Sequence, residues 1–416
     1  MSIFSGVIYS FLCIEFIASG IADKQRDQRY RILANTVKTT IHNSFAEIGT
    51  ATGQLDGGGD PFLDPCFLEA AELHGAVSRA MAWQPCHVAA CAEGGSLRGL
   101  MPLYRRNHSF GDFSRDYGWA QAWRQLGHDY YPKLVTGIPY TPATGPRFLL
   151  DAGASREDTV GALLAATIDL ARAAGISVWQ FLYGRSDDLA MLDATGFLLR
   201  PIVQYHWQRG QWRDFGDFLD ALTAKRRKEI RRERRRVAEQ GLRIEVRHGD
   251  ELDTGDTKLW AAIHRHYQNT FERYGTPHAF TEGFFRDVAA GLGRRFVVFI
   301  AFRGELPVAS AICYRDEHTL FGRHWGADEE IDCLHFELCQ YQGIDYCLRE
   351  GLQHFEPGAG GEHKVNRGFL PTRTWSAYWI DEPRLRRAVA DFIGRERSAI
   401  DDYIEASIGE SPFRAS

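Results

Sequence analysis

The sequence lacks any pair of cysteines at the two-residue spacing of common zinc and redox motifs, although it contains eight cysteines in 416 residues. A chain of this length can bury a large core without disulfides, so we expect free, mostly buried thiols in a reducing compartment. The group Cys333, His335 and Cys339 does not have the spacing of a structural zinc site. We therefore predict no metal and no disulfide framework.

Long apolar runs are also scarce, since only residues 3–22 form one. No Lys or Arg precedes this run, whereas Lys24, Arg26, Arg29 and Arg31 follow it. A secretory signal has the opposite polarity. We therefore predict an N-terminal extension without an essential role, and a cytoplasmic body without a membrane span.

The chain has little net charge, at −5, which gives no global reason to expect nucleic acid. One segment differs, because residues 225–236 hold nine Lys or Arg against Glu229 and Glu233, a local charge of +7. The rest of the chain therefore carries −12, from −5 minus +7. This asymmetry predicts one basic helix on an acidic body.

The length and composition indicate two globular domains. A hairpin, a third strand, a helix and a further strand occur twice: at 86–105, 134–140, 159–174 and 177–183, and again at 296–315, 319–325, 335–350 and 352–356. A polar stretch with a glycine-rich end, residues 23–60, has the composition of a linker. We predict four segments: an extension and linker (1–60), a first lobe (61–213), a basic helical insert (214–245) and a second lobe (246–416).

This order of elements resembles the GNAT fold, in which a mostly antiparallel sheet splays open after its fourth strand. Two such lobes with a charged insert resemble the Fem-type aminoacyl transferases. Residues 61–413 are most similar to a bacterial Fem-like family labelled peptidoglycan biosynthesis/recognition. The motifs that carry this resemblance are FGD (110–112), DYGW (116–119), YYPKL (130–134), TPATGPR (141–147), KRRK (225–228), GRHWG (322–326), HFELC (335–339), GAGGEHK (358–364) and RGFLP (367–371). The expected fold class is therefore α/β (α+β), with two tandem GNAT-like lobes.

The absence of one motif narrows the choice of acyl donor. GNAT lobes that use acetyl-CoA carry an Arg/Gln-x-x-Gly-x-Gly/Ala run before the central helix, where backbone N–H groups hold the pyrophosphate. Here segment 326–334 contains Asp328, Glu329, Glu330 and Asp332, which would repel that group, and loop 141–155 also lacks the run. The Fem resemblance implies aminoacyl-tRNA as the donor, with acetyl-CoA as the less favoured alternative and no other cofactor.

The basic segment 224–240 could provide the contact surface for tRNA, because it lacks Gly and Pro and is rich in helix-forming residues. Its excess positive charge could neutralise several phosphates. Two other interpretations remain open: a solvated helix with internal salt bridges, and binding to an anionic membrane surface. The residues that we expect to contact RNA are Arg227, Arg231, Arg232, Arg235 and Arg236.

The densest group of candidate catalytic residues lies in 356–371, where three glycines precede a Glu-His-Lys sequence. Aminoacyl transfer needs a base for the ammonium nucleophile and a cation or N–H pair for the oxyanion. Glu362 or His363 could be the base, and Lys364 or Arg367 could hold the oxyanion. The alternative is a polar surface loop with a glycine-rich turn.

Two further groups complete the predicted site. On the second lobe, Arg323, Trp325, His335 and Glu337 should face the same cleft, and strand alternation puts Arg323 and Trp325 on one face. On the first lobe, a cationic and aromatic group suits an anionic acceptor such as a cell-wall precursor (muropeptide), an identity that rests on the resemblance. Its members are Asp116, Tyr117, Trp119, Lys133, Tyr140, Thr141 and Arg147.

These patterns favour an acyltransferase that joins an amine to an aminoacyl or other acyl donor. An acetyl-CoA-dependent GNAT N-acetyltransferase with an atypical donor site is the second interpretation. The third is a protein that binds peptidoglycan or tRNA on a GNAT scaffold without catalysis.

Overall fold

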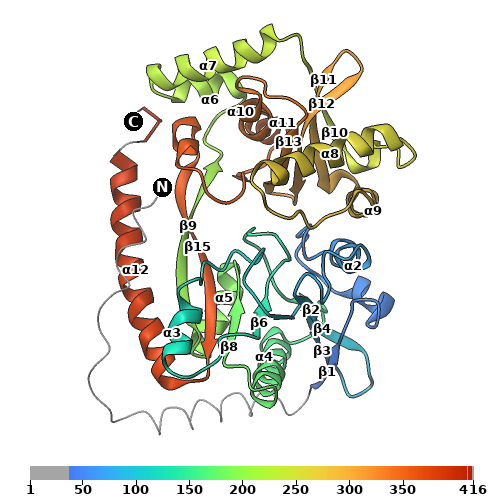
Figure 1. Ribbon diagram of the computed structural model, residues 1–416, viewed down its shortest axis with the longest axis vertical. Helices are drawn as coiled ribbons and strands as arrows, with labels where there is room; N and C mark the ends of the chain where they lie inside the picture. Colours follow the sequence, from blue (N-terminus) through green and yellow to red (C-terminus); the bar gives the residue numbers. More distant parts are fainter. Residues whose placement is uncertain (1–36, 410, 415–416) are drawn as a thin grey trace.

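The computed structural model describes residues 37–409 and 411–414, so the predicted extension 1–36 lies outside the described residues. One large sheet runs through both lobes (Figure 1). Its strands lie in the order β10 (Arg243–His248), β11 (Phe296–Arg303), β12 (Leu306–Arg315), β13 (Thr319–Ala327), β14 (His354–Glu356), β9 (Leu198–Gln208), β15 (Leu370–Ile380), β8 (Val178–Phe181), β6 (Lys133–Thr136), β5 (Tyr104–Arg106) and β2 (Trp83–Pro85).

A smaller sheet belongs to the first lobe and contains β1 (Lys38–His42), β3 (His87–Cys91), β4 (Leu97–Met101) and β7 (Leu149–Leu150). Strand β1 pairs with β3, and the side chains of Phe45 and Asp60 are buried. Linker composition is thus a poor guide for residues 37–60, because backbone pairing and a few anchoring side chains are enough to hold a polar segment on the lobe. The remaining helices of this lobe are α2 (Pro65–Leu73), α3 (Trp119–Gln125), α4 (Arg156–Ala173) and α5 (Ser186–Ala194).

The second lobe has helices on both faces of its sheet, and strand β11 shows why. Phe296, Val298 and Ile300 pack in one buried cluster with helices α8 (Thr257–Arg273) and α9 (Glu282–Leu292). The alternate residues 297, 299 and 301 pack in a second cluster with α10 (Leu334–Phe336) and α11 (Gln342–Glu350). Because both faces of the strand are covered, it is a continuous apolar run.

The helix predicted over 335–350 is interrupted. A π-helical turn, Glu337–Tyr341, separates α10 from α11, and α11 ends at Gly351 with φ of 77°, as its sequence predicts. A π-turn widens the helix locally, and such turns occur often at functional sites.

The two lobes share strands. Strand β9 leaves the first lobe and pairs through Trp207 and Gln208 with β14 of the second, while β15 returns and pairs with both β9 and β8. Helix α12 (Pro383–Gly409) then packs along β9 and β15 (Figure 1). Residues 370–409, which follow the second lobe in sequence, therefore complete the first.

The insert between the lobes contains α6 (Phe215–Ala221) and the basic α7 (Ala224–Glu239), at the top of Figure 1. The predicted α/β fold of two tandem lobes with a basic helical insert is thus confirmed. The seven cysteines among the described residues are free. No described helix combines the length and the apolar character that a bilayer crossing requires.

Candidate functional site

The second-lobe sheet opens between β13 and β14. The two strands run parallel from the pair Thr319–His354 to the pair Phe321–Glu356, where β14 ends and β13 continues. At this point Gly322 lies so close to Pro357 that an added Cβ would be 3.3 Å from its Cα. The small cleft beside this opening is lined by residues of both lobes: Pro142, Ala143, Gln204, Phe321, Gly322, Arg323, Glu356 and Gly358.

Glu356 is the acidic group of this cleft, and its side chain is only 12% exposed. Oε2 accepts a hydrogen bond from the backbone N of Thr144 at 3.2 Å, so both lobes contribute to its surroundings. Burial raises the pKa of Glu356 from 4.5 to about 8, with smaller contributions from Asp60 and Asp316. The carboxyl group therefore exchanges its proton close to neutral pH.

Glu356 faces an imidazole whose tautomer the structure indicates. His206 Nε2 lies 3.0 Å from Gln204 Oε1, and Gln204 donates its own amide N–H to the carbonyl of Pro142 at 2.8 Å. Burial lowers the pKa of His206 to about 4, so the ring is neutral and its proton belongs on Nε2. The free lone pair of Nδ1 then points toward Glu356 Oε1, 3.9 Å away.

Lys364 supplies a cation on the other side of the opening. Its Nζ donates to the carbonyl oxygens of Gly358 at 2.9 Å and Pro357 at 3.4 Å. Burial, with a smaller contribution from nearby Arg323, lowers its pKa from 10.5 to about 8. The cleft residue Glu356 and the amine bound to the carbonyl of the cleft residue Gly358 thus both have pKa values near 8, and strongly shifted pKa values are typical of functional sites.

The other predicted catalytic residues lie elsewhere in the 3₁₀ segment η5 (Glu362–Arg367). Glu362 and His363 are exposed. Arg367 is buried and paired with Glu233 of α7 at 2.7 Å, and it also donates to Tyr341 Oη at 2.8 Å. The Arg367 guanidinium therefore holds α7 against the second lobe. Of the four predicted catalytic residues, Lys364 is the one that contacts the cleft residue Gly358.

The four predicted second-lobe residues do not all lie at the cleft: some are there, and others lie toward α7. They are Arg323, Trp325, His335 and Glu337. A β-bulge places Arg323 between the pairs Ile312–His324 and Cys313–Gly322, which breaks the strict alternation that we expected along this strand. Arg323 reaches the first lobe and donates to the carbonyl of Tyr140 at 2.5 Å. Trp325 and His335 stack edge to face at 5.2 Å, while Glu337 is buried against Arg234 of α7 at 3.1 Å.

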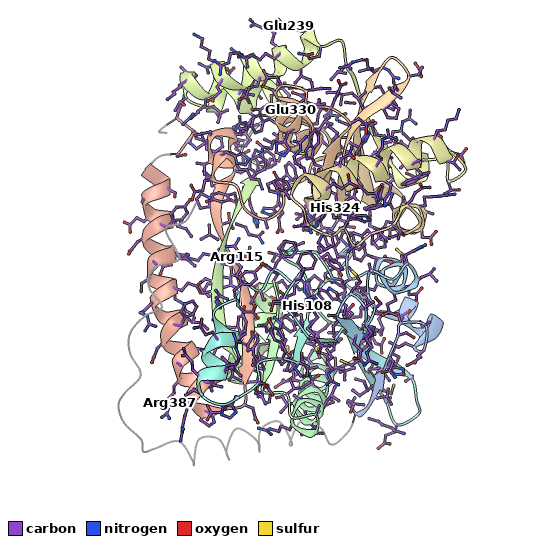
Figure 2. All side chains as sticks on the ribbon, in the orientation of Figure 1. His108, Arg115, Glu239, His324, Glu330 and Arg387 are labelled. Carbon is purple, nitrogen blue, oxygen red and sulfur yellow. The ribbon has the colours of Figure 1, made fainter. Side chains whose placement is uncertain are left out.

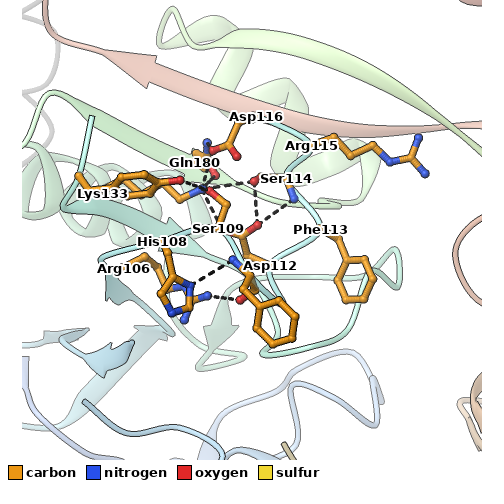
Figure 3. A network of polar contacts seen from close by, with 12 residues as sticks. Arg106, His108, Ser109, Asp112, Phe113, Ser114, Arg115, Asp116, Lys133 and Gln180 are labelled. Carbon is orange, nitrogen blue, oxygen red and sulfur yellow. Dashed lines mark hydrogen bonds and ion pairs between the residues drawn. The ribbon is translucent and has the colours of Figure 1, made fainter. Parts of the chain in front are cut away.

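Lys133 forms the centre of a buried network in the first lobe (Figure 3). Its Nζ lies 2.8 Å from Asp112 and 2.6 Å from Asp116, and all three side chains are 0% exposed. It also donates to Ser109 at 2.7 Å and to Gln180 at 2.9 Å. An anionic acceptor cannot reach this ammonium, so Lys133 and Asp116 hold the loop instead of contacting a ligand.

The other residues of the predicted acceptor group do not converge either. Arg147 is buried and donates to four backbone carbonyls, including those of Leu182 and Tyr183, so it fixes the loop after β8. Trp119 packs against Tyr378 in the core. The hydroxyls of Tyr140 and Thr141 donate to backbone carbonyls, whereas Tyr117 is 81% exposed. At most of these positions the cationic and aromatic side chains therefore form contacts inside the lobe and are not arranged as a ligand-binding group.

Helix α7 has a docked face and an exposed face. Ile230, Glu233 and Val237 are buried against the second lobe. Of the arginines predicted to bind RNA, Arg227 and Arg231 lie near Asp220, and Arg236 pairs with Asp332 at 2.8 Å. Arg232 and Arg235 are exposed, and the described residues place no carboxylate within ion-pair distance of either; the same holds for Lys225 and Lys228.

The acidic segment before α10 is less repulsive than its sequence indicates. Asp328 pairs with Arg265 at 2.7 Å, Glu329 pairs with Arg303, and Asp332 pairs with Arg236. Three of its four carboxylates are thus compensated, and Glu330 is left exposed. The missing glycine-rich run, more than the charge, now argues against acetyl-CoA. Among the described residues, no group of three or more His, Cys, Asp or Glu is placed to hold a metal.

Sequence reasoning missed Gln204, His206 and Glu356. Glu356 carried one usable signal, an acidic residue at the end of a buried strand directly before Pro-Gly. Gln204 and His206 lie in a strand that contains both polar and apolar residues, and its sequence gives no sign of a functional role. Only the pairing of β9 with β14 brings them to the carboxylate.

These features define an α/β protein of two GNAT-like lobes with a cleft where the second-lobe sheet opens. A family model described as peptidoglycan biosynthesis/recognition, FemAB-like, matches residues 44–415, and the chain belongs to this family. No curated protein sequence matches it.

Solved structures resemble the chain at low sequence identity. The C-terminal domain of a protein described as a lysylphosphatidylglycerol synthetase from Agrobacterium fabrum superposes with a TM-score of 0.50 at 12% identity, over 86% of this chain and 98% of that one. FemX gives a TM-score of 0.45 at 12% identity, over 84% and 99%. A tandem GNAT protein from the clavulanic acid pathway gives 0.42 at 12% identity, over 83% and 99%.

Replacing Lys133 by Ala should destabilise the protein by about 3 to 5 kcal/mol, because two buried carboxylates lose their counter-ion. Urea unfolding followed by circular dichroism measures the change. Lys225→Ala, which removes an exposed lysine from α7, is the matched control and should change stability by less than about 0.5 kcal/mol. Equal stability of the two variants would contradict a structural role for Lys133.

Glu356→Gln should stabilise the fold increasingly as the pH rises. The folded protein holds the Glu356 proton up to about pH 8, whereas an unfolded glutamate loses it near 4.5, so native stability falls across this interval. Glutamine keeps an acceptor for the Thr144 N–H and does not ionise. We expect similar melting temperatures for both proteins near pH 4.5 and a growing advantage of the variant up to about pH 8. Parallel melting curves across this range would show that Glu356 has an ordinary pKa.

Proposed function

We propose that this protein is an acyltransferase that transfers an aminoacyl or other acyl group to an amine at the β13–β14 cleft. The observation that carries the proposal is the presence of two largely buried ionisable groups at the opening of the sheet. They are Glu356, at the end of β14, and Lys364, which donates to the carbonyls of Pro357 and Gly358, and each has its pKa moved to about 8. Family membership supports a role in peptidoglycan biosynthesis or recognition.

In the proposed reaction the acceptor enters as an ammonium, and the Glu356 carboxylate takes one of its protons. The neutral amine attacks the carbonyl carbon of the donor ester, and the carbonyl electrons move to oxygen. The Lys364 ammonium stabilises that oxyanion, an interaction worth several kcal/mol in a desolvated site. When the tetrahedral intermediate collapses, the ester C–O bond breaks and the leaving hydroxyl takes its proton from Glu356. The carboxylate formed in this way accepts the surplus proton of the attacking nitrogen and releases it to solvent, which leaves a neutral amide.

His206 assists this proton transfer without itself becoming charged. Its Nε2 proton is held by Gln204, so only the Nδ1 lone pair can accept a hydrogen bond from protonated Glu356. An imidazole with a pKa of about 4 remains neutral at pH 7 and orients the acid. We therefore assign Glu356 as the base and His206 and Gln204 as positioning residues.

Aminoacyl-tRNA is the donor that we propose, and a cell-wall precursor with a free amine is the proposed acceptor. The absence of the glycine-rich run in 326–334 and the exposed basic groups on the outer face of α7 support the first assignment. The family description supports the second. Both substrates would meet the enzyme in the cytoplasm.

Lys364→Ala should lower turnover about a hundredfold, equivalent to roughly 3 kcal/mol of transition-state stabilisation. Glu356→Gln should lower it by a similar factor, since the amide cannot accept the proton. In the native enzyme kcat/KM should rise about tenfold per pH unit toward pH 8, as Glu356 becomes ionised, and fall above it, as the Lys364 ammonium loses its proton. The assay follows product formation from charged tRNA and an amine acceptor.

Glu362→Gln is the matched control for Glu356→Gln, because it makes the same chemical change on an exposed carboxylate six residues away. It should keep native turnover and the native pH profile. If Glu356→Gln turns over normally while Glu362→Gln does not, the base is in η5 and the assignment is wrong.

Charge reversal of Arg232 and Arg235 should weaken tRNA binding and lower the salt dependence of log Kd by about two, one for each phosphate that these side chains no longer neutralise. Filter binding over a range of KCl concentrations measures both quantities. Charge reversal of the exposed Lys258 and Arg273 on α8 changes the net charge equally and should leave the salt dependence unaltered. Equal effects from both pairs would mean that only net charge matters.

A further inference from the structure

Residues 112–117, in the loop between β5 and α3, alternate between buried and exposed side chains. Asp112, Ser114 and Asp116 are buried, whereas Phe113, Arg115 and Tyr117 are exposed. The three inward residues all contact Lys133 (Figure 3). A buried ammonium therefore organises this loop, and the side chains of Phe113, Arg115 and Tyr117 remain exposed.

The backbone of this loop is held in a costly conformation. Phe113 has φ of 59° and Arg115 has φ of 52°, in the left-handed region that non-glycine residues rarely adopt. Two buried side chains fix it with three hydrogen bonds: Tyr183 Oη donates to the carbonyl of Phe113 at 2.7 Å, and Arg200 donates to the carbonyls of Ser114 at 3.0 Å and Arg115 at 3.3 Å. Strained segments that the surroundings determine so fully are concentrated at functional sites.

The exposed side chains of this loop are two aromatic rings and, between them in the sequence, one guanidinium. Phe113 is 37% exposed and Tyr117 is 81% exposed. Arg115 is also exposed, and the described residues include no carboxylate within ion-pair distance of it. Rings of this kind stack on nucleic acid bases, and an arginine between them can contact the linking phosphate.

The position of these side chains connects them to the proposed donor surface. Figure 2 shows Arg115 beside β9, level with the boundary between the lobes. The loop and η5 both adjoin β9: Arg200 of this strand donates to the carbonyl of Arg115, and Leu370, three residues after the end of η5, pairs with His206 of the same strand. The segment η5 also contacts α7 through Arg367 and Glu233. A donor that lies on α7 could therefore extend past η5, which also carries Lys364, to this loop.

We propose that Phe113, Arg115 and Tyr117 form a binding site for the single-stranded end of an RNA. This inference deepens the proposed function and rests on its choice of donor. Bases stack on Phe113 and Tyr117, and the Arg115 guanidinium holds the phosphate between them. An anionic membrane is the less favoured partner. Membrane-binding surfaces carry clusters of basic residues, whereas the exposed side chains of this loop include a single basic residue, Arg115.

The test uses a fluorescently labelled single-stranded RNA of about six nucleotides, a length within the site sizes of such proteins, and measures its anisotropy with the full-length protein. Tyr117→Ala and Phe113→Ala should each weaken binding about tenfold, as loss of one stacked base predicts. Arg115→Ala should weaken it and reduce the salt dependence by about one. Tyr274→Ala removes a ring that is 74% exposed just after α8 and should bind like the native protein.

Native-like RNA binding by Tyr117→Ala would overturn the proposal, since a ring this exposed can be removed without disturbing the fold. The proposal would also be wrong if the three loop variants kept RNA binding but no longer sedimented with vesicles of phosphatidylglycerol. Loss of RNA binding supports the site even if Glu356→Gln keeps full turnover, a result that would count against the proposed transferase alone. Full turnover and native RNA binding in the loop variants would reject the loop and leave the transferase intact.

Discussion

The antiparallel pairing of β9 with β15 is the constraint on which the rest of the molecule depends. It runs from Leu370–His206 to Tyr378–Leu198 and crosses the boundary between the lobes. Because β9 also pairs with β14, the next position in that register sets His206 opposite Glu356. The proposed acid and its positioning imidazole thus come from different lobes and are aligned by backbone hydrogen bonds, which fix geometry more firmly than loops do.

Burial at the lobe boundary explains why the same residue types behave differently across the structure. Glu356 and Lys364 have few internal partners, and desolvation moves their pKa values toward each other. Lys133 is buried still more deeply but is surrounded by carboxylates and hydroxyls, which compensate its charge. A buried ionisable group whose charge is not fully balanced by neighbouring groups can exchange a proton in a reaction. A buried group whose charge is balanced stabilises the fold instead.

The sequence alone predicts much of the fold, because strand alternation and helix formation are local. The continuous apolar strand at 296–303, the helix that ends at Gly351 and the basic helix α7 follow directly from residue patterns. The functional residues are harder to find, since burial depends on contacts that are distant in sequence. Lys133 and Arg147 have the chemistry of anion-binding residues, yet their partners show that they are internal. His206 reaches Glu356 only through a strand pairing that no local pattern encodes.

The shared strands also bear on how the chain is made. Residues 61–208 leave the ribosome well before residues 370–380, yet β15 occupies the place between β8 and β9. The first lobe therefore emerges with two unpaired strand edges and an uncovered apolar surface, which α12 later covers. It cannot mature as an independent unit during translation, because its last strand arrives only after the second lobe has been synthesised. The two lobes are consequently committed to fold together.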